Sequence, residues 1–232
     1  MADGEAKDGR GFGRIDPARI REHMVDVNDG ILATAGFAEG LLGAGLASTQ
    51  VYAIIAISAV AGAVGVAGAK FGEESSNREA ELQLVAEERR LLDLSPEEER
   101  AELIEHYRAK GLSLDTAQRV ADELTLADAL SAQLETEYGI RELTTRWDPW
   151  VAALWSGLGF LLGAAVPVLV SLLIPGAWMD EFILLAVVVS LAVTGFVLSR
   201  LGHTRVAATL VRSVLIGLAS LGASYLLGSW IG

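Results

Sequence analysis

A run near the N-terminus, Val27–Gly45, decides the fold, and its sequence is VNDGILATAGFAEGLLGAG. Most of this run is apolar, but it contains two carboxylic acids, Asp29 and Glu39. A charged carboxylate at the centre of a membrane helix costs about 2.5–3.5 kcal/mol on insertion scales. If the run crosses a membrane, something must therefore neutralise the two acids or hide them from lipid.

The composition of the whole chain favours a membrane protein. Of its 232 residues, 52% are hydrophobic and only 6% are aromatic, so the apolar content comes mainly from Ala, Leu, Val and Ile. The chain has no cysteine, which excludes disulfides and thiolate metal sites. Its first residues are polar and mixed in charge, so we expect no secretory signal.

Five segments are long and apolar enough to cross a bilayer, which takes about 20 helical residues. We expect transmembrane helices at roughly Val25–Ala47, Val51–Phe71, Trp150–Ile174, Phe182–Ser199 and Val206–Ile231. The sequence thus predicts an all-α membrane protein in four parts. These are a cytoplasmic N-terminal arm (1–24), two spans (25–72), an acidic helical domain (73–146) and three further spans (147–232).

Lysine and arginine set the expected orientation, because they gather on the cytoplasmic side of membrane proteins. Basic residues occur in the N-terminal arm, at the end of the acidic block and in the loop between the last two spans. The loops at 48–50 and 175–181 contain none. In a five-span topology all three basic regions fall on one side, which predicts a cytoplasmic N-terminus and an outer C-terminus.

Nearly all the negative charge lies in one block. Residues 73–146 contain 19 acidic and 9 basic side chains, a net charge of −10 out of −12 for the whole chain. A block with this charge does not bind nucleic acid, and its natural partners are cations.

The acidic block has the start and stop signals of helices. The second span continues without a proline, which predicts one long helix to about Leu92. SPEEE at Ser95 predicts a helix start with a capping box to Glu98. The remaining signals are a stop at Gly111, starts at Ser113 and Thr125, and a stop at Gly139.

Asp29 and Glu39 are candidate ligands for a hard divalent cation or a proton. They are ten residues apart, which is about 15 Å along a helix and about 80° in projection, so they could share one broad face. The alternatives are an interfacial helix-start role for Asp29 and a buried, protonated, structural role for Glu39. Gly36 and Gly40 form a GxxxG pair, which indicates either a close helix dimer or simply a glycine-rich helix.

In the acidic block, pairs such as Glu99/Glu102 and Glu102/Glu105 have helical i,i+3 spacing. They either converge on a metal or form a solvated face. The chain has no P-loop, dinucleotide fingerprint, nucleophile elbow or Glu-x-x-His motif at these helices. We therefore expect no enzyme, no nucleotide-driven pump and no di-iron centre.

The order of these elements resembles the vacuolar iron transporter family, in its bacterial branch. The resemblance rests on VNDGILATAGFAEGLLGAG, a second span running into REAELQLVAEERRLL, then SPEEERAELIEHYRAKGLS and DELTLADALSAQLETEYGI, followed by three more spans. It implies a homodimer with five spans per chain, a cytoplasmic three-helix metal-binding domain and translocation between the two first spans. The implied metal ligands are Asp29 in the pathway and Glu88, Glu99, Glu102 and Glu137 in the domain.

The chain departs from the plant and fungal pattern of that family. Its second-span glutamate and methionine positions fall on Ser58 and Val66. One domain glutamate position falls on Leu91, and a domain methionine position falls near Gln133. A thioether-containing iron site therefore does not carry over, and Glu39 is the carboxylate that could replace the missing one. An all-oxygen path suits Mn²⁺ or Fe²⁺ better than copper or zinc.

Together these observations predict a bacterial inner-membrane exporter of Fe²⁺ or Mn²⁺ that exchanges the metal for protons and has no permanently bound cofactor. Two alternatives remain open at this point. One is a membrane-anchored metal buffer or sensor without transport, and the other is a scaffold whose acidic helices bind a basic partner.

Overall fold

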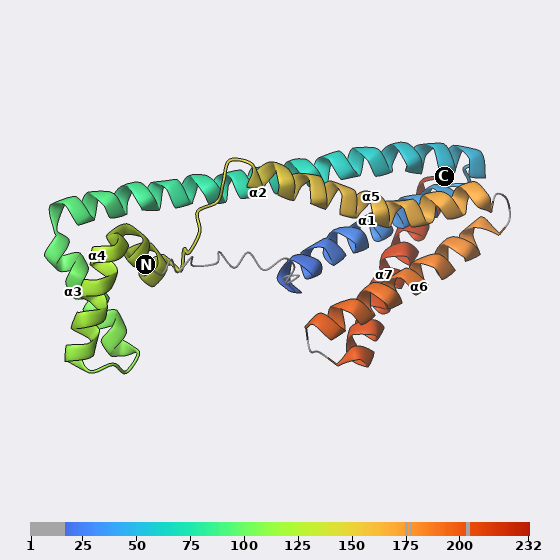
Figure 1. Cartoon of the computed structure of the whole chain (residues 1–232). Helices are drawn as coiled ribbons and strands as arrows, with labels where there is room; N and C mark the ends of the chain where they lie inside the picture. The colour runs from blue at the N-terminus through green and yellow to red at the C-terminus, as the bar shows by residue number, and fades with distance from the viewer. Residues whose placement is uncertain (1–16, 175, 177, 203–204) are drawn as a thin grey trace, which may run out of the picture. The chain divides into compact units, whose positions relative to one another are not determined.

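The computed structural model describes residues 17–174, 176, 178–202 and 205–232, and within these ranges the secondary structure is entirely α-helical (Figure 1). Residues 1–16 of the predicted N-terminal arm lie outside the described residues. In chain order the helices are α1 (Pro17–Gly43), α2 (Ser48–Leu94), α3 (Pro96–Ala109), α4 (Leu114–Tyr138), α5 (Asp148–Leu173), α6 (Met179–Leu201) and α7 (Val206–Ile231).

The chain forms two compact units. We call Ala69–Ala152 the acidic unit, and Met1–Gly68 with Ala153–Gly232 the hydrophobic unit. Helix α2 contributes its first part to the hydrophobic unit and its second part to the acidic unit. The prediction that the second span continues as one long helix is confirmed, since α2 ends only at Leu94.

Four of the described helices, α2, α5, α6 and α7, are long and apolar enough to cross a membrane. This agrees with an all-α membrane protein. Helix α1 does not belong to this group, since it carries Arg19, Arg21 and four acids along its length. A fifth span at α1 therefore stays a prediction.

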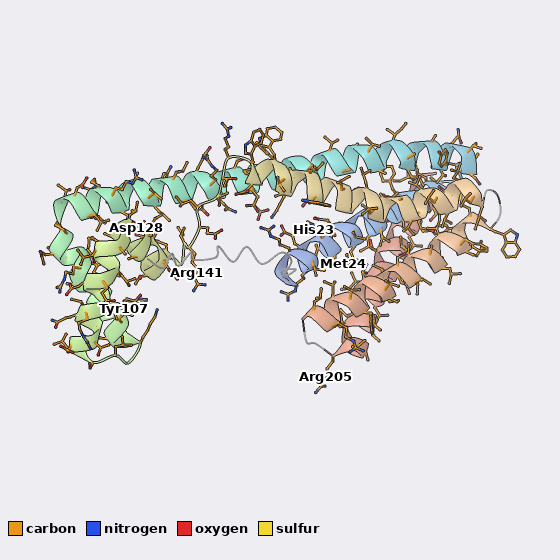
Figure 2. All side chains as sticks on the ribbon, viewed as in Figure 1. His23, Met24, Tyr107, Asp128, Arg141 and Arg205 are labelled. Carbon is orange, nitrogen blue, oxygen red and sulfur yellow. The ribbon has the colours of Figure 1, made fainter. Side chains whose placement is uncertain are left out.

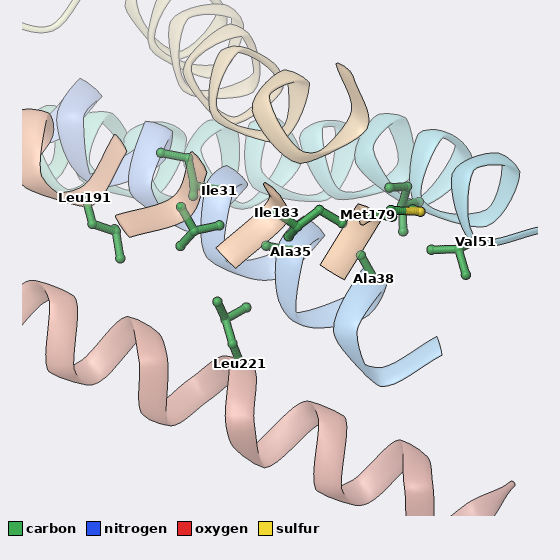
Figure 3. Close-up of a cluster of buried hydrophobic side chains, with 10 residues drawn as sticks. Ile31, Ala35, Ala38, Val51, Met179, Ile183, Leu191 and Leu221 are labelled. Carbon is green, nitrogen blue, oxygen red and sulfur yellow. The ribbon is translucent and has the colours of Figure 1, made fainter. Parts of the chain in front are cut away.

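The core of the hydrophobic unit surrounds α1 (Figure 3). Side chains of α1 meet those of α6, α7 and the start of α2. A second cluster joins α2 to α5 through Ala59, Ala63, Phe160 and Ala164. The main core consists of Ile31, Ala35, Ala38, Val51, Ile55, Met179, Ile183, Val187, Leu191 and Leu221.

Glycine lets α1 approach its neighbours at backbone distance. A Cβ atom added at Gly30 or at Gly163 would collide with the backbone of the facing helix, which is α5 in the first case and α1 in the second. The same holds for Gly228 of α7 against Gly40 of α1. Such close crossings are how helices pack in lipid, where no hydrophobic effect drives them together.

In the acidic unit, α3 and α4 pack as an antiparallel pair (Figure 1) around Leu103, Ala121 and Ala132. Arg100 of α3 also donates a hydrogen bond to Asp122 of α4 over 2.5 Å. After α4, the backbone amide and the hydroxyl of Thr144 both donate to Glu81 of α2 over 2.8 Å. These contacts join α3 to α4, and they join the loop after α4 to α2.

Most of the predicted helix signals in this unit are confirmed. Ser113 caps α4 by accepting a hydrogen bond from the Thr116 amide over 3.3 Å, and Gly111 and Gly139 follow α3 and α4 with φ of 96° and 71°. The capping box at Ser95 is wrong, because the Ser95 side chain makes no capping hydrogen bond. The helix still begins there, with a proline in its first turn.

Helix α4 is interrupted at Asp128, whose φ of −165° and ψ of 95° are not helical (Figure 2). The Asp128 carboxylate accepts hydrogen bonds from the Ser131 hydroxyl over 2.7 Å and from the Ser131 amide over 3.1 Å. This is the geometry of an N-cap. The second half of α4 therefore begins after Asp128, and the predicted start at Thr125 is wrong.

Candidate functional site

The acidic unit brings together the four glutamates that the sequence singled out. Glu88 comes from α2, Glu99 and Glu102 from α3, and Glu137 from α4. Glu88 has no exposed surface and Glu99 is 5% exposed, whereas Glu102 and Glu137 are open to solvent. The cluster thus has a buried pair and an exposed pair.

The buried Glu88 carboxyl group is an unusual feature. Within the described residues, no hydrogen-bond donor reaches either of its oxygen atoms, and the adjacent polar group is the Glu99 carboxyl. A buried carboxylate without a donor is costly unless a cation or a proton neutralises it.

The charges around Glu88 have one sign. Burial raises the pKa of Glu88 to about 7, and the nearby carboxyls of Glu99, Glu137 and Glu102 add to this shift. Burial and the Glu99 and Glu137 charges also raise the pKa of Glu102. Burial, together with the Glu137 carboxylate, raises the pKa of Tyr138 to about 12. The four glutamate carboxyls lie close together in the acidic unit, and this concentration of negative charge favours binding of a cation.

Gln133 positions the Glu99 side chain. Its amide nitrogen Nε2 donates to the backbone oxygen of Glu99 over 2.6 Å and to the Glu99 carboxylate oxygen Oε2 over 3.0 Å. Gln133 is only 3% exposed, so these hydrogen bonds are shielded from water. Sequence analysis noted Gln133 only as a departure from a methionine position. Its contact with Glu99 was invisible because 34 residues separate the two.

The four glutamates are neighbours, but they do not form a closed ligand shell. Among the described residues, no group of three or more His, Asp or Glu side chains is arranged closely enough to hold a metal ion. Like charges repel one another, so carboxylates converge fully only around a cation.

In the hydrophobic unit, the structure places Asp29 and Glu39 on different faces of α1. Asp29 is exposed and belongs to a stripe of exposed positions at a spacing of four, Val25, Asp29, Ala33 and Phe37. Glu39 is 2% exposed and points into the bundle. The expectation that the two acids share one face is therefore wrong, because Glu39 packs between α6 and α7.

Glu39 lines a cavity of about 360 Å³. The Asp180 carboxyl group at the start of α6 also lines it and lies within hydrogen-bonding reach of Glu39. Sequence analysis missed Asp180. The available signal was the loop PGAWMDE, which carries two acids and no basic residue between two spans. The remaining lining residues are Leu184, Leu221, Gly222, Tyr225 and Leu226.

The other polar and small residues of α1 serve packing within the chain. The Asn28 side-chain oxygen accepts a hydrogen bond from the Thr194 hydroxyl of α6 over 2.6 Å. Gly36 and Gly40 both face Ser224 of α7, so this GxxxG pair is occupied inside one chain. It is therefore not evidence for a dimer.

Comparison with known proteins identifies the chain's relatives. The model of the VIT family matches residues 20–229. A protein of Acanthamoeba castellanii (strain ATCC 30010 / Neff) named "Vacuolar iron transporter" is 34% identical over 157 residues, which cover 63% of this chain and 60% of that protein. The match thus spans less than two thirds of the relative's length. The family is one of transporters and not of enzymes, as the sequence predicted. Because the family model covers nearly the whole chain, the protein belongs to the VIT family.

Proposed function

We propose that this protein exports Fe²⁺ or Mn²⁺ from the cytoplasm in exchange for protons, and that it works as a homodimer. Membership of the VIT family and the name of the Acanthamoeba relative support metal transport. The observation that carries the proposal is the buried, donor-free Glu88 carboxyl beside Glu99. Burying a carboxyl group without a hydrogen-bond donor costs free energy, and binding a cation offsets that cost.

The acidic unit collects ions before transport. Glu102 and Glu137 are exposed and attract cations from solution, and Glu88 and Glu99 lie behind them as ligands. Carboxylates are ligands that suit Mn²⁺ and other hard ions. The chain has no cysteine, and position 66 is valine where the family pattern has methionine. The lack of these sulfur ligands also supports Fe²⁺ or Mn²⁺ as the metal.

Asp29 is the proposed ligand in the translocation path. It lies on the exposed stripe of α1 with Val25, Ala33 and Phe37, so a single chain in a bilayer would leave it facing lipid. A second chain packed against this stripe removes that cost. The two copies of Asp29 then supply two negative charges, which match one divalent cation.

Proton exchange follows from the same chemistry. A carboxyl group must be deprotonated to bind a metal ion, so metal binding releases protons and proton binding releases metal. In the proposed topology of five spans, the N-terminus is cytoplasmic, the C-terminus is outside and the host membrane is a bacterial inner membrane.

Flux through proteoliposomes tests the transport proposal. With an imposed pH gradient, we expect uptake of Fe²⁺ or Mn²⁺ to exceed that of Co²⁺ and Zn²⁺, and Asp29→Asn to abolish it. A metal buffer or sensor, which the Glu88–Glu99 pair alone would also support, binds metal but moves none. Wild-type flux from Asp29→Asn would remove Asp29 from the mechanism.

Cysteine cross-linking tests the dimer, since the natural chain has no cysteine. Ala33→Cys lies on the exposed stripe of α1 and should form a disulfide-linked dimer in membranes. Val189→Cys is a matched control, because Val189 is an exposed apolar position, 54% accessible, on α6. Equal cross-linking at both positions, or none at Ala33→Cys, contradicts a dimer through α1.

A further inference from the structure

The cavity beside Glu39 contains a carboxyl pair that the metal path described above does not use. Glu39 is 2% exposed, and its oxygen Oε1 has no hydrogen-bond partner among the described residues. Asp180 faces it from the first turn of α6. Two facing acids in a buried site cannot both be charged unless a cation lies beside them, and without a cation they share a proton.

The position of this pair in the fold is distinctive. The turn between α1 and α2 and the turn between α5 and α6 meet at one end of the hydrophobic unit, where the Gly176 amide donates to the Ser48 hydroxyl over 3.3 Å. Glu39 lies one turn of helix before the end of α1, and Asp180 lies at the start of α6, so both belong to this end. Asp29 lies ten residues earlier on α1, about 15 Å along the helix.

The cavity is large enough for a hydrated divalent cation beside the two carboxyl groups. The cavity volume is about 360 Å³, and one water molecule occupies about 30 Å³ in the liquid, so an ion fits together with several waters. Two carboxylates match a charge of +2, and waters complete the coordination shell that a hard cation requires. The other lining side chains are mainly apolar, such as Leu184, Leu221 and Leu226, so Glu39 and Asp180 supply the carboxyl groups of the lining.

We propose that Glu39 and Asp180 form a second divalent-cation site, built within a single chain and separate from both Asp29 and the acidic unit. In the context of the proposed export function, on which this role rests, it is the last site that the ion occupies before release. Because its ligands come from α1 and α6 of one chain, it does not require a dimer to bind metal.

Metal binding to the full-length protein in detergent tests the site. The starting protein is the Asp29→Asn/Glu88→Gln/Glu99→Gln/Glu102→Gln/Glu137→Gln variant, which removes the other proposed ligands, and the probe is Mn²⁺ followed by electron paramagnetic resonance. We expect this variant to retain one Mn²⁺ site per chain. Adding Glu39→Gln or Asp180→Asn should weaken binding on the order of tenfold or more, because each change removes one ligand charge.

Glu105→Gln is the control, because Glu105 is exposed, forms an ion pair with Arg108 and does not line the cavity. It should leave Mn²⁺ binding close to that of the starting protein. Helix content and the thermal midpoint of Asp180→Asn show whether a loss of binding reflects unfolding, and loss of binding in a folded variant supports the site. The proposal is overturned if the starting variant binds no Mn²⁺, or if both substitutions bind Mn²⁺ as it does.

The same experiment separates this inference from the proposed function. If Glu39→Gln loses Mn²⁺ binding and the wild-type protein shows no flux, the site is supported and the transport proposal is rejected. Flux in the wild-type protein without a site at Glu39 and Asp180 keeps transport and rejects the inference.

Discussion

The two units of this protein place carboxyl groups in opposite ways. In the acidic unit, four glutamates from three helices lie close together, of which two are buried and two are open to water. In the hydrophobic unit, the acids of α1 are separated, with Asp29 on an outer face and Glu39 inside beside Asp180. Water screens like charges on a surface, whereas an acid that is buried or faces lipid is costly until a proton, a cation or a second chain offsets that cost.

The largest expected effect concerns metal binding by the acidic unit. Glu88→Gln/Glu99→Gln should weaken Mn²⁺ binding to this unit on the order of 100-fold, because it removes both buried ligand charges. Glu105→Gln is the matched control, since Glu105 is exposed and paired with Arg108 over 3.1 Å. Isothermal titration of full-length protein in detergent measures the difference. Equal affinities in the two variants would mean that the buried pair is not a metal site.

The second prediction concerns pH. The pKa of Glu88 is raised from an ordinary value of 4.5 to about 7 in the folded protein. Between these two pH values, the folded protein keeps a proton on Glu88 that the unfolded chain has released. Stability should therefore fall as the pH rises from about 4.5 through 7, because the unfolded chain loses this proton first. The loss is complete only about one pH unit above the folded-state pKa.

Thermal melting followed by circular dichroism, in metal-free detergent buffer, measures this dependence. Glu88→Gln has no proton to lose, so its melting temperature should change less over the same pH range. Mn²⁺ should raise the midpoint of the wild-type protein at pH 7.5, because a ligand that binds the folded state stabilises it. Parallel pH curves for the two proteins contradict a buried, proton-binding Glu88.

Sequence reasoning succeeded further in the acidic unit than in the hydrophobic unit. Local signals such as Ser113 and Gly139 specify where a helix begins or ends, and the structure follows them. The resemblance to a known family supplied Glu88 and Glu137, which no spacing rule connects. Asp180 escaped because its contact with Glu39 spans two helices that are distant in sequence, and helical periodicity describes only one helix at a time.

The third prediction sharpens the role of the buried pair. Gln133→Ala removes the donor that holds the Glu99 carboxylate, and it should lower stability by about 1–3 kcal/mol and weaken Mn²⁺ binding severalfold. Gln118→Ala is a matched control on the exposed side of the same helix. If the two variants bind Mn²⁺ equally well, Gln133 serves packing and does not position Glu99.

The smallest expected effect comes from the break in α4. Asp128 caps the second half of this helix, which carries Gln133 and Glu137. Asp128→Ala should lower the free energy of unfolding, as the loss of an N-cap does, and shift metal affinity only slightly. Because hydrogen bonds from Ser131 lower the pKa of Asp128 below 3.8, this contribution is present above that pH and is lost as the pH falls through the lowered pKa.

Asp115→Ala is the control: Asp115 forms only an exposed ion pair with Arg119 over 3.4 Å, which contributes about 0–1 kcal/mol. Chemical denaturation of the two variants at pH 7 and pH 3 distinguishes a cap, whose effect disappears in acid, from a residue that merely occupies a bend.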